Sequence, residues 1–192
     1  WHVEDVEGVD EKLRTVYLTG NAKESNEDPY FLHMYKVNID GSSLKLLSAA
    51  NHDHSVNMDD SKRFFVDNYS RVNTAPISAL YDANGKRLLD LEVTDMSGLM
   101  QAGYKFPEPF KAKADDGITD LYGVMYKPFD FDSTKKYPVL VYLYNGPHSQ
   151  MVTNTWMAGG ELWYQYMAEK GFIVFTLDGR GTSFRGKVFE QA

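Results

Sequence analysis

The sequence contains no cysteine. It therefore excludes a disulfide framework, a thiol nucleophile and a metal held by thiolates, and it leaves the redox compartment open. Lys and Arg number 20 against 27 Asp and Glu, and no basic run occurs, so nucleic acid is not an expected partner. No apolar window approaches the roughly 20 residues that a membrane-spanning helix needs. What remains is ordinary for a protein that buries a core, with 43% hydrophobic and 24% charged residues.

The two ends of the sequence lack the marks of natural termini. The chain opens on Trp1-His2-Val3 without an initiator Met or a charged-then-apolar signal, and it closes directly after a Gly-rich loop. We therefore expect an internal piece of a longer protein.

The first half of the sequence is typical of repeated β structure. Two hairpins are predicted to turn at Asp40-Gly41 and at Asn84-Gly85, and a single strand precedes each of them, at 14–20 and 63–70. The turn glycines are roughly 44 residues apart, and strand-then-hairpin repeats of about 40–50 residues are typical of β-propeller blades. The alternative is two unrelated hairpins in a sandwich. Two blades cannot close a propeller of ~4–8 blades, which agrees with an internal piece.

From residue 104 the pattern changes to α/β. Residues 106–128 predict two strands around a turn at Asp116-Gly117. The run "VLVYLYNG" (139–146) and the run "FIVFTLD" (172–178) are apolar enough for strands buried on both faces. The second half therefore starts an α/β domain.

The segment between these two runs predicts a helix at 159–171. Its expected apolar face holds Leu162, Tyr166 and Met167, and Gly171 is a plausible C-cap. Strand, helix and strand together predict a βαβ unit in a parallel sheet. A strand edge left open at 172–177 would favour self-association of the piece.

Polar loops follow both strands of the predicted βαβ unit, and in parallel sheets ligands sit beyond these strand ends. The loop 178–186 matches two motifs only in part. A dinucleotide fingerprint would need glycine where Phe184 stands. A nucleophile elbow cannot absorb the extra residue between Ser183 and Gly186, so we expect Ser183 to be a loop serine.

The histidines do not form a convincing site. His148 has no Asp placed by sequence to orient it, so we expect a loop histidine. His52 and His54 flank Asp53, but this set is too sparse for a metal site, and a polar turn between strands is the expectation.

The two loops and their strands resemble a known family. "KKYPVLVYLYNGPHSQ", then a helix, then "GFIVFTLDGRGTSFRG", resembles the dipeptidyl peptidase IV branch of the prolyl oligopeptidase family of serine peptidases. The family pattern Tyr-x-Gly-Pro-x-Ser-Gln is matched by Tyr144, Gly146, Pro147, Ser149 and Gln150, and its Asp-Gly-Arg-Gly by residues 178–181. The resemblance is strong from about 137 to 186 and looser before.

The resemblance implies a mixed fold. Residues 1–103 would be the C-terminal blades of an eight-bladed β-propeller, and residues 104–192 the N-terminal part of an α/β-hydrolase (peptidase) domain. The family's Ser, Asp and His triad would lie beyond Ala192, and its paired glutamates, which hold the substrate's amino terminus, before Trp1. The chain alone would then be inactive.

The resemblance also implies what the parent protein does. It would be a serine exopeptidase that removes dipeptides from peptides with Pro or Ala at the second position. It would need no cofactor, form a homodimer, and be exported, periplasmic or at the cell surface.

Of the family's functional residues, only Tyr144 is carried over as catalytic, because its counterpart donates a phenol hydrogen bond to the oxyanion. Asn145, Gly146 and Pro147 are expected to form the turn that orients it. Asp178 and Arg180 would support the site from the neighbouring loop, with an ion pair between them as one candidate contact. The other interpretation of Tyr144 is an aromatic residue packed at a strand end.

Two further interpretations of the whole chain stay open at this point. The first is a family member that has lost its triad and binds proteins or peptides. The second is a stand-alone β-rich binding module with an appended α/β lobe.

Overall fold

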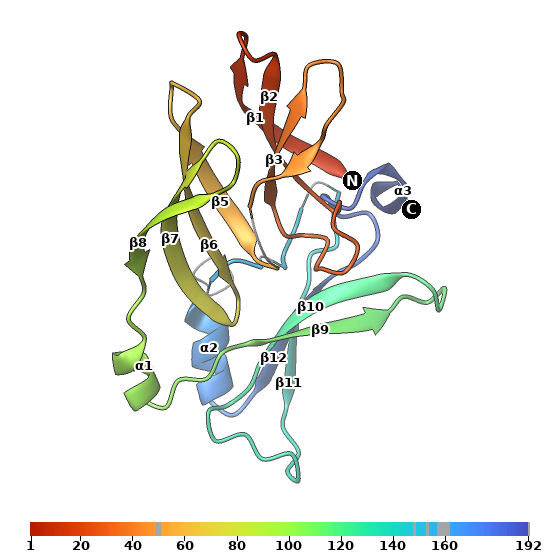
Figure 1. The fold of residues 1–192 in the computed structure, drawn as a ribbon. Coiled ribbons are helices and arrows are strands. Elements are labelled where there is room, and N and C mark those ends of the chain that lie inside the picture. The colour runs from red at the N-terminus through yellow and green to blue at the C-terminus, as the bar shows by residue number, and fades with distance from the viewer. Residues whose placement is uncertain (49–50, 148, 153, 157–161, 192) are drawn as a thin grey trace. The chain divides into compact units, whose positions relative to one another are not determined.

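The structure, a computed structural model, describes residues 1–48, 51–147, 149–152, 154–156 and 162–191. It divides into two compact units (Figure 1). Unit 1 comprises Trp1–Ser70, Pro76–Thr94 and Phe184–Gly186, and unit 2 comprises Arg71–Ala75, Asp95–Ser183 and Lys187–Ala192.

Unit 1 contains two four-stranded sheets, each with its strands in chain order. The first consists of β1 (His2–Asp10), β2 (Thr15–Asn21), β3 (His33–Asn38) and β4 (Lys45–Leu46). The second consists of β5 (Asp53–Met58), β6 (Phe64–Arg71), β7 (Thr74–Asp82) and β8 (Arg87–Val93). Four-stranded sheets with this strand order are the arrangement of propeller blades, so the predicted repeat is confirmed.

The two predicted hairpin turns lie where the sequence placed them. Gly41 and Gly85 have φ angles of 84° and 80°, which are accessible to glycine at little cost. At the second turn a side chain would also have no room, because a Cβ on Gly85 would lie 2.7 Å from the carbonyl oxygen of Leu47. The β3–β4 and β7–β8 connections therefore depend on these glycines.

The core of unit 1 is shared by its two sheets. Its buried members are Tyr17, Met34, Leu47, Phe65, Ala79 and Tyr81. The rings of Phe65 and Tyr81 stack with centroids 5.2 Å apart and planes 9° apart. Each sheet thus buries its apolar side chains against the other rather than alone.

The polar turn expected around His54 is wrong. The segment Asp53–Met58 is strand β5, paired antiparallel with β6. His54 is 1% exposed, and its Nδ1 lies 2.8 Å from Oδ2 of Asp67 on β6. A buried carboxylate partner lets a polar side chain occupy an inward strand position, which composition alone does not reveal.

Unit 2 is built on a mixed sheet. Its strands are β9 (Glu108–Lys113), β10 (Asp120–Tyr126), β11 (Val139–Tyr142) and β12 (Ile173–Asp178), and its helices are α1 (Ser97–Gln101), α2 (Leu162–Glu169) and α3 (Lys187–Glu190). The strand order is β11-β12-β10-β9. β11 and β12 are parallel, with α2 between them in the chain, while β10 is antiparallel to both β12 and β9. The predicted βαβ unit and the predicted 106–128 hairpin are confirmed.

The expected burial of β11 is wrong. The strand lies at the edge of the sheet, and Val139 and Val141 are 55% and 48% exposed. β12 lies inside the sheet, between β11 and β10, so the open edge is β11 and not residues 172–177. Apolar composition predicted a buried strand but not which strand would be covered.

The expected apolar face of the helix is also wrong in part. Leu162 and Tyr166 are 62% and 60% exposed, whereas Tyr164 and Ala168 are buried and Met167 is partly buried. The Tyr164 ring contacts the rings of Tyr126 and Tyr142, with centroids 5.2 and 5.6 Å away. Tyr164 and Ala168 are four residues apart and therefore share a helix face.

Candidate functional site

Tyr144 lies two residues beyond the end of β11, and its side chain is 65% exposed. Its ring lies against the backbone of Gly146. A Cβ added at Gly146 would be 2.1 Å from Cε1 of Tyr144, so only glycine leaves the ring this place. The phenol is therefore accessible to a ligand, and its ring position depends on the residue two places later.

The backbone of this loop has two distinctive features. Asn145 has φ of 49°, in the left-handed region that Asn tolerates better than most residues. The Ser149 N–H donates to the Gly146 carbonyl oxygen at 3.4 Å. This contact closes a turn with Pro147 at its second position, where the fixed φ of proline fits. His148 lies outside the described residues.

The side chain of Asn145 joins the loop after β11 to the loop after β12. Its Oδ1 accepts a hydrogen bond from the Gly179 N–H at 2.9 Å. Gly179 allows this approach, since a Cβ there would lie 3.2 Å from Cγ of Asn145. The two loops that the sequence placed beyond adjacent strand ends are thus in direct contact.

Asp178 makes a second connection between these loops. Its carboxylate is 0% exposed and accepts the backbone N–H groups of Met151 and Val152, each at 2.9 Å. Burial raises the pKa of Asp178, and these two N–H groups oppose that rise by stabilising the charged form. The carboxylate therefore anchors the chain that follows the Tyr144 loop.

The candidate ion pair between Arg180 and Asp178 is wrong. The Arg180 guanidinium lies 3.4 Å from Oδ1 of Asp115 and 3.4 Å from Oδ2 of Asp116. Asp178 is directed toward the 151–152 backbone instead. Hydrogen bonds from the Thr119 side chain and backbone, then from the Ile118 N–H, lower the pKa of Asp116 to about 2, with Arg180 a lesser cause.

The loop after β12 contains one buried polar residue that sequence reasoning missed. Thr182 is 0% exposed, and its hydroxyl donates to the Gly179 carbonyl oxygen at 2.9 Å. Gly181, with φ of 97°, donates its N–H to Phe189 O at 2.8 Å. A threonine among loop glycines carries no sequence signal for such a role.

Unit 1 holds a Ser–His–Glu chain that has the composition of a catalytic triad. His33 Nδ1 lies 3.2 Å from the hydroxyl of Ser48, and its Nε2 lies 2.8 Å from Glu27. Ser48 is 0% exposed, and its oxygen already accepts the Met34 N–H. No substrate can reach a buried hydroxyl, so this set of three hydrogen-bonded residues is a structural element.

His33 also lies beside the His54–Asp67 pair, with the two imidazole centroids 5.1 Å apart. Burial lowers the pKa of His33 to about 4, and the neighbouring His54 contributes to the shift. Among the residues that the structure describes, no group of three or more His, Cys, Asp or Glu could hold a metal ion. The buried histidines thus connect the two sheets through the contact between their rings.

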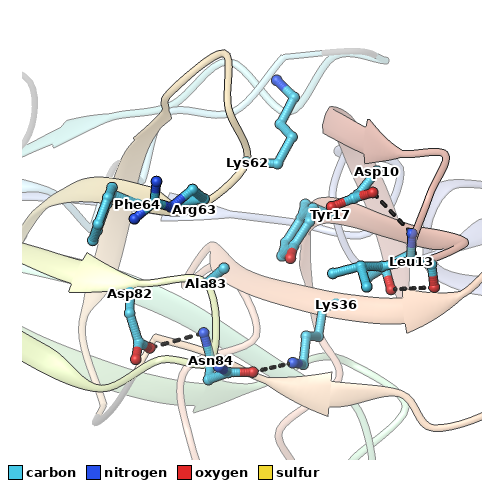
Figure 2. A pocket seen from close by; sticks show the side chains of 11 residues that line it. Asp10, Leu13, Tyr17, Lys36, Lys62, Arg63, Phe64, Asp82, Ala83 and Asn84 are labelled. Carbon is cyan, nitrogen blue, oxygen red and sulfur yellow. Dashed lines mark hydrogen bonds between the residues drawn. The ribbon is translucent and has the colours of Figure 1, made fainter.

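A cavity of about 350 Å³ lies at one end of unit 1, among the β1–β2, β5–β6 and β7–β8 turns (Figure 2). Its basic side chains do not converge. Lys36 Nζ donates to Asn84 Oδ1 at 2.6 Å, while Figure 2 shows Lys62 and Arg63 extending in different directions. Ligand sites have a few polar groups aimed at a common point, so the Tyr144 loop is the stronger candidate.

No helix among the described residues is long and apolar enough to span a membrane.

Comparison with known proteins extends over nearly the whole chain. A family described as the dipeptidyl peptidase IV (DPP IV) N-terminal region matches residues 1–76. The chain is 35% identical to dipeptidyl-aminopeptidase B of Aspergillus niger, over 97% of this chain and 21% of that protein. It is 29% identical to human dipeptidyl peptidase 8, over 96% of this chain and 21% of that protein.

A solved structure gives the same result. The crystal structure assigned to a dipeptidyl aminopeptidase IV of Bacteroides ovatus matches with a TM-score of 0.80 and 34% identity, over 99% of this chain and 26% of that one. The chain spans about a fifth of the length of the curated relatives. In sequence and in fold, the chain is thus similar to part of the dipeptidyl peptidase IV family.

Proposed function

We propose that this chain is part of a serine-type dipeptidyl peptidase that removes X-Pro and X-Ala dipeptides from peptide N termini. The names of its relatives, dipeptidyl peptidase 8 and dipeptidyl-aminopeptidase B, support the reaction class. The parallel β11–β12 pair with α2 between its strands supports the start of an α/β-hydrolase domain in unit 2. Export of the parent protein and its assembly as a homodimer belong to the same proposal.

The role proposed for Tyr144 is donation of its phenol hydrogen to the oxyanion. In acyl transfer, negative charge develops on the carbonyl oxygen, and donors aimed at that position lower the barrier. One donor is commonly the backbone N–H after the nucleophile, and a second comes from a neighbouring loop. The observation that supports this role is that the Tyr144 phenol is exposed beyond a strand end, on a loop that Asn145 and Asp178 hold in place.

The supporting loop residues have different proposed tasks. Gly146 leaves space for the ring, and Pro147 occupies the second position of the turn. Asp178 anchors the chain after the turn, and Arg180 fixes the neighbouring loop to the β9–β10 turn. The triad itself is proposed to come from sequence outside this chain, so the isolated chain should not hydrolyse peptides.

The test is a single-atom change in the full-length protein. Tyr144→Phe removes only the phenol oxygen, and its kcat on a chromogenic X-Pro amide should fall by about 10²–10³-fold. Tyr166→Phe is the matched control, since Tyr166 is similarly exposed but lies on α2. Wild-type kcat in Tyr144→Phe would overturn the role of the phenol.

The wild-type protein distinguishes the remaining interpretations. An active serine peptidase should be labelled by a fluorophosphonate and lose activity on labelling. A full-length protein that neither turns over X-Pro amides nor reacts with the probe would instead be a binding protein without a triad. Turnover by the isolated chain, abolished by the same probe, would contradict its proposed inactivity.

A further inference from the structure

The position of Tyr144 is not secured by packing around its ring. The side chain is 65% exposed, so few atoms restrict its rotation. An oxyanion donor nevertheless has to lie within about 2.7–3.1 Å of the position that the charged oxygen will take. The constraint on Tyr144 must therefore come mainly from the backbone of the adjoining residues.

Asn145 meets two structural requirements at the next position. Its backbone is left-handed, with φ of 49°, which costs most L-residues roughly 1–2 kcal/mol and Asn less. Its side-chain oxygen also accepts the Gly179 N–H at 2.9 Å. Glycine would satisfy the first requirement but not the second, and alanine would satisfy neither.

The backbone that Asn145 binds is itself held in place. Gly179 follows Asp178, whose buried carboxylate accepts the N–H groups of Met151 and Val152. The Gly179 carbonyl oxygen accepts the hydroxyl of the buried Thr182. The hydrogen bond from Gly179 to the Asn145 side chain therefore holds the loop that carries Tyr144 against the fixed end of β12.

We propose that Asn145 is the positioning residue of Tyr144, and that the hydrogen bond from the Gly179 N–H to its side-chain oxygen fixes the direction of the phenol. The inference rests on the proposed function, because it assigns a residue that acts through the proposed donor. A group that acts only by orienting an oxyanion donor affects the transition state and not substrate binding. Loss of the amide should therefore lower kcat and leave KM unchanged.

The decisive variant is Asn145→Gly in the full-length protein, because it keeps the left-handed backbone and removes only the side-chain bond. We expect kcat to fall about 10-fold, the scale of one hydrogen bond, with KM within about twofold of wild type. Asn84→Gly is the matched control, since Asn84 is an exposed loop asparagine of unit 1, and it should keep wild-type kinetics. A wild-type kcat in Asn145→Gly would overturn the inference.

A double-mutant cycle separates positioning from a general structural effect. If Asn145 acts through Tyr144, Asn145→Gly should cause no further loss of kcat in the Tyr144→Phe background. The same 10-fold loss in both backgrounds would show that Asn145 acts elsewhere and would refute the inference. An unchanged kcat in Tyr144→Phe alone would instead refute the proposed function, so the two failures are distinguishable.

A readout without catalysis covers the case in which Asn145→Gly folds poorly. With 3-fluorotyrosine at position 144, the fluorine resonance should move in Asn145→Gly and stay in Asn84→Gly. Asn145→Asp keeps an acceptor oxygen and tolerance of the left-handed backbone. Its resonance should remain at the wild-type position, and a displacement equal to that of Asn145→Gly would overturn the inference.

Discussion

Replacing Gly146 with alanine should displace the Tyr144 ring without unfolding the domain. The new Cβ would lie 2.1 Å from Cε1, 2.8 Å from Cδ1 and 3.0 Å from Cζ of that ring. Carbon atoms pack at about 3.5–4.0 Å, so the ring must move by roughly 1.4–1.9 Å to escape the 2.1 Å contact. Because the ring is 65% exposed, it can rotate toward solvent at little cost in stability.

A misplacement of about 1 Å can lower a catalysed rate about 10²-fold. We therefore expect Gly146→Ala in the full-length protein to lower kcat on an X-Pro amide by about 10²-fold, with KM little changed. The free energy of unfolding, measured by urea titration, should change by less than about 1 kcal/mol. This combination of lost activity and retained stability is the specific signature of a displaced donor.

Gly98→Ala is the control for the same chemical change. A Cβ on Gly98 meets no atom within 4 Å, and the residue lies in α1. It should retain wild-type kcat and gain up to about 1 kcal/mol of stability from helix propensity. Wild-type kcat in Gly146→Ala would refute the reasoning, because the ring would then have no required position.

Two further predictions concern buried charge. The pKa of His33 is lowered to about 4, so the unfolded chain takes up the proton first, and stability should fall by up to about 3 kcal/mol as pH drops from 6.5 to 4. Burial raises the pKa of Asp53 to about 6, and this shift opposes the loss because the folded protein takes up that proton first. In urea titrations at pH 7, 5.5 and 4.5, the free energy of unfolding should fall less steeply with decreasing pH in His33→Gln and more steeply in Asp53→Asn than in the wild type. Equal pH dependence in the three proteins would contradict the assignment. Asp178→Asn should cost about 1–3 kcal/mol in the same assay, because one of two backbone N–H groups loses its acceptor. Arg180→Ala, at an exposed pair, should cost less than about 1 kcal/mol, and equal losses in these two variants would contradict the anchoring role of Asp178.

Local signals in the sequence predicted the turns and the strand–helix–strand unit. Asp40-Gly41 and Asn84-Gly85 mark hairpins because left-handed backbone is needed there, and that requirement depends on a few adjacent residues. The Asp116-Gly117 turn follows the same logic, with Asp116 accepting N–H groups of Ile118 and Thr119. Such features need no knowledge of distant contacts.

Features that depend on distant contacts were not predictable. The composition of β11 is that of a covered strand, but its place at the sheet edge follows from strand order. Tyr164 rather than Tyr166 faces the core because of where Tyr126 and Tyr142 lie. His54 occupies an inward strand position because its ring contacts the carboxylate of Asp67 on the paired strand β6, 13 residues away in sequence.

The candidate site likewise combines features that local sequence predicts with features that depend on distant contacts. The resemblance points to Tyr144, and its position beyond a strand end follows from the βαβ pattern. The hydrogen bond from Gly179 to Asn145 spans 34 residues, and the partners of Asp178 and Arg180 are 26 or more residues away. The sequence therefore indicated which loops matter, whereas only the fold showed which side chains join them.

The short span of these connections has a consequence for biosynthesis. The hydrogen bonds that hold the Tyr144 loop join residues no more than 34 positions apart in the sequence, around one βαβ unit. Contacts of small sequence separation form early, and domains fold progressively as the chain emerges from the ribosome. All the groups that form these bonds are thus present once Thr182 has emerged during translation.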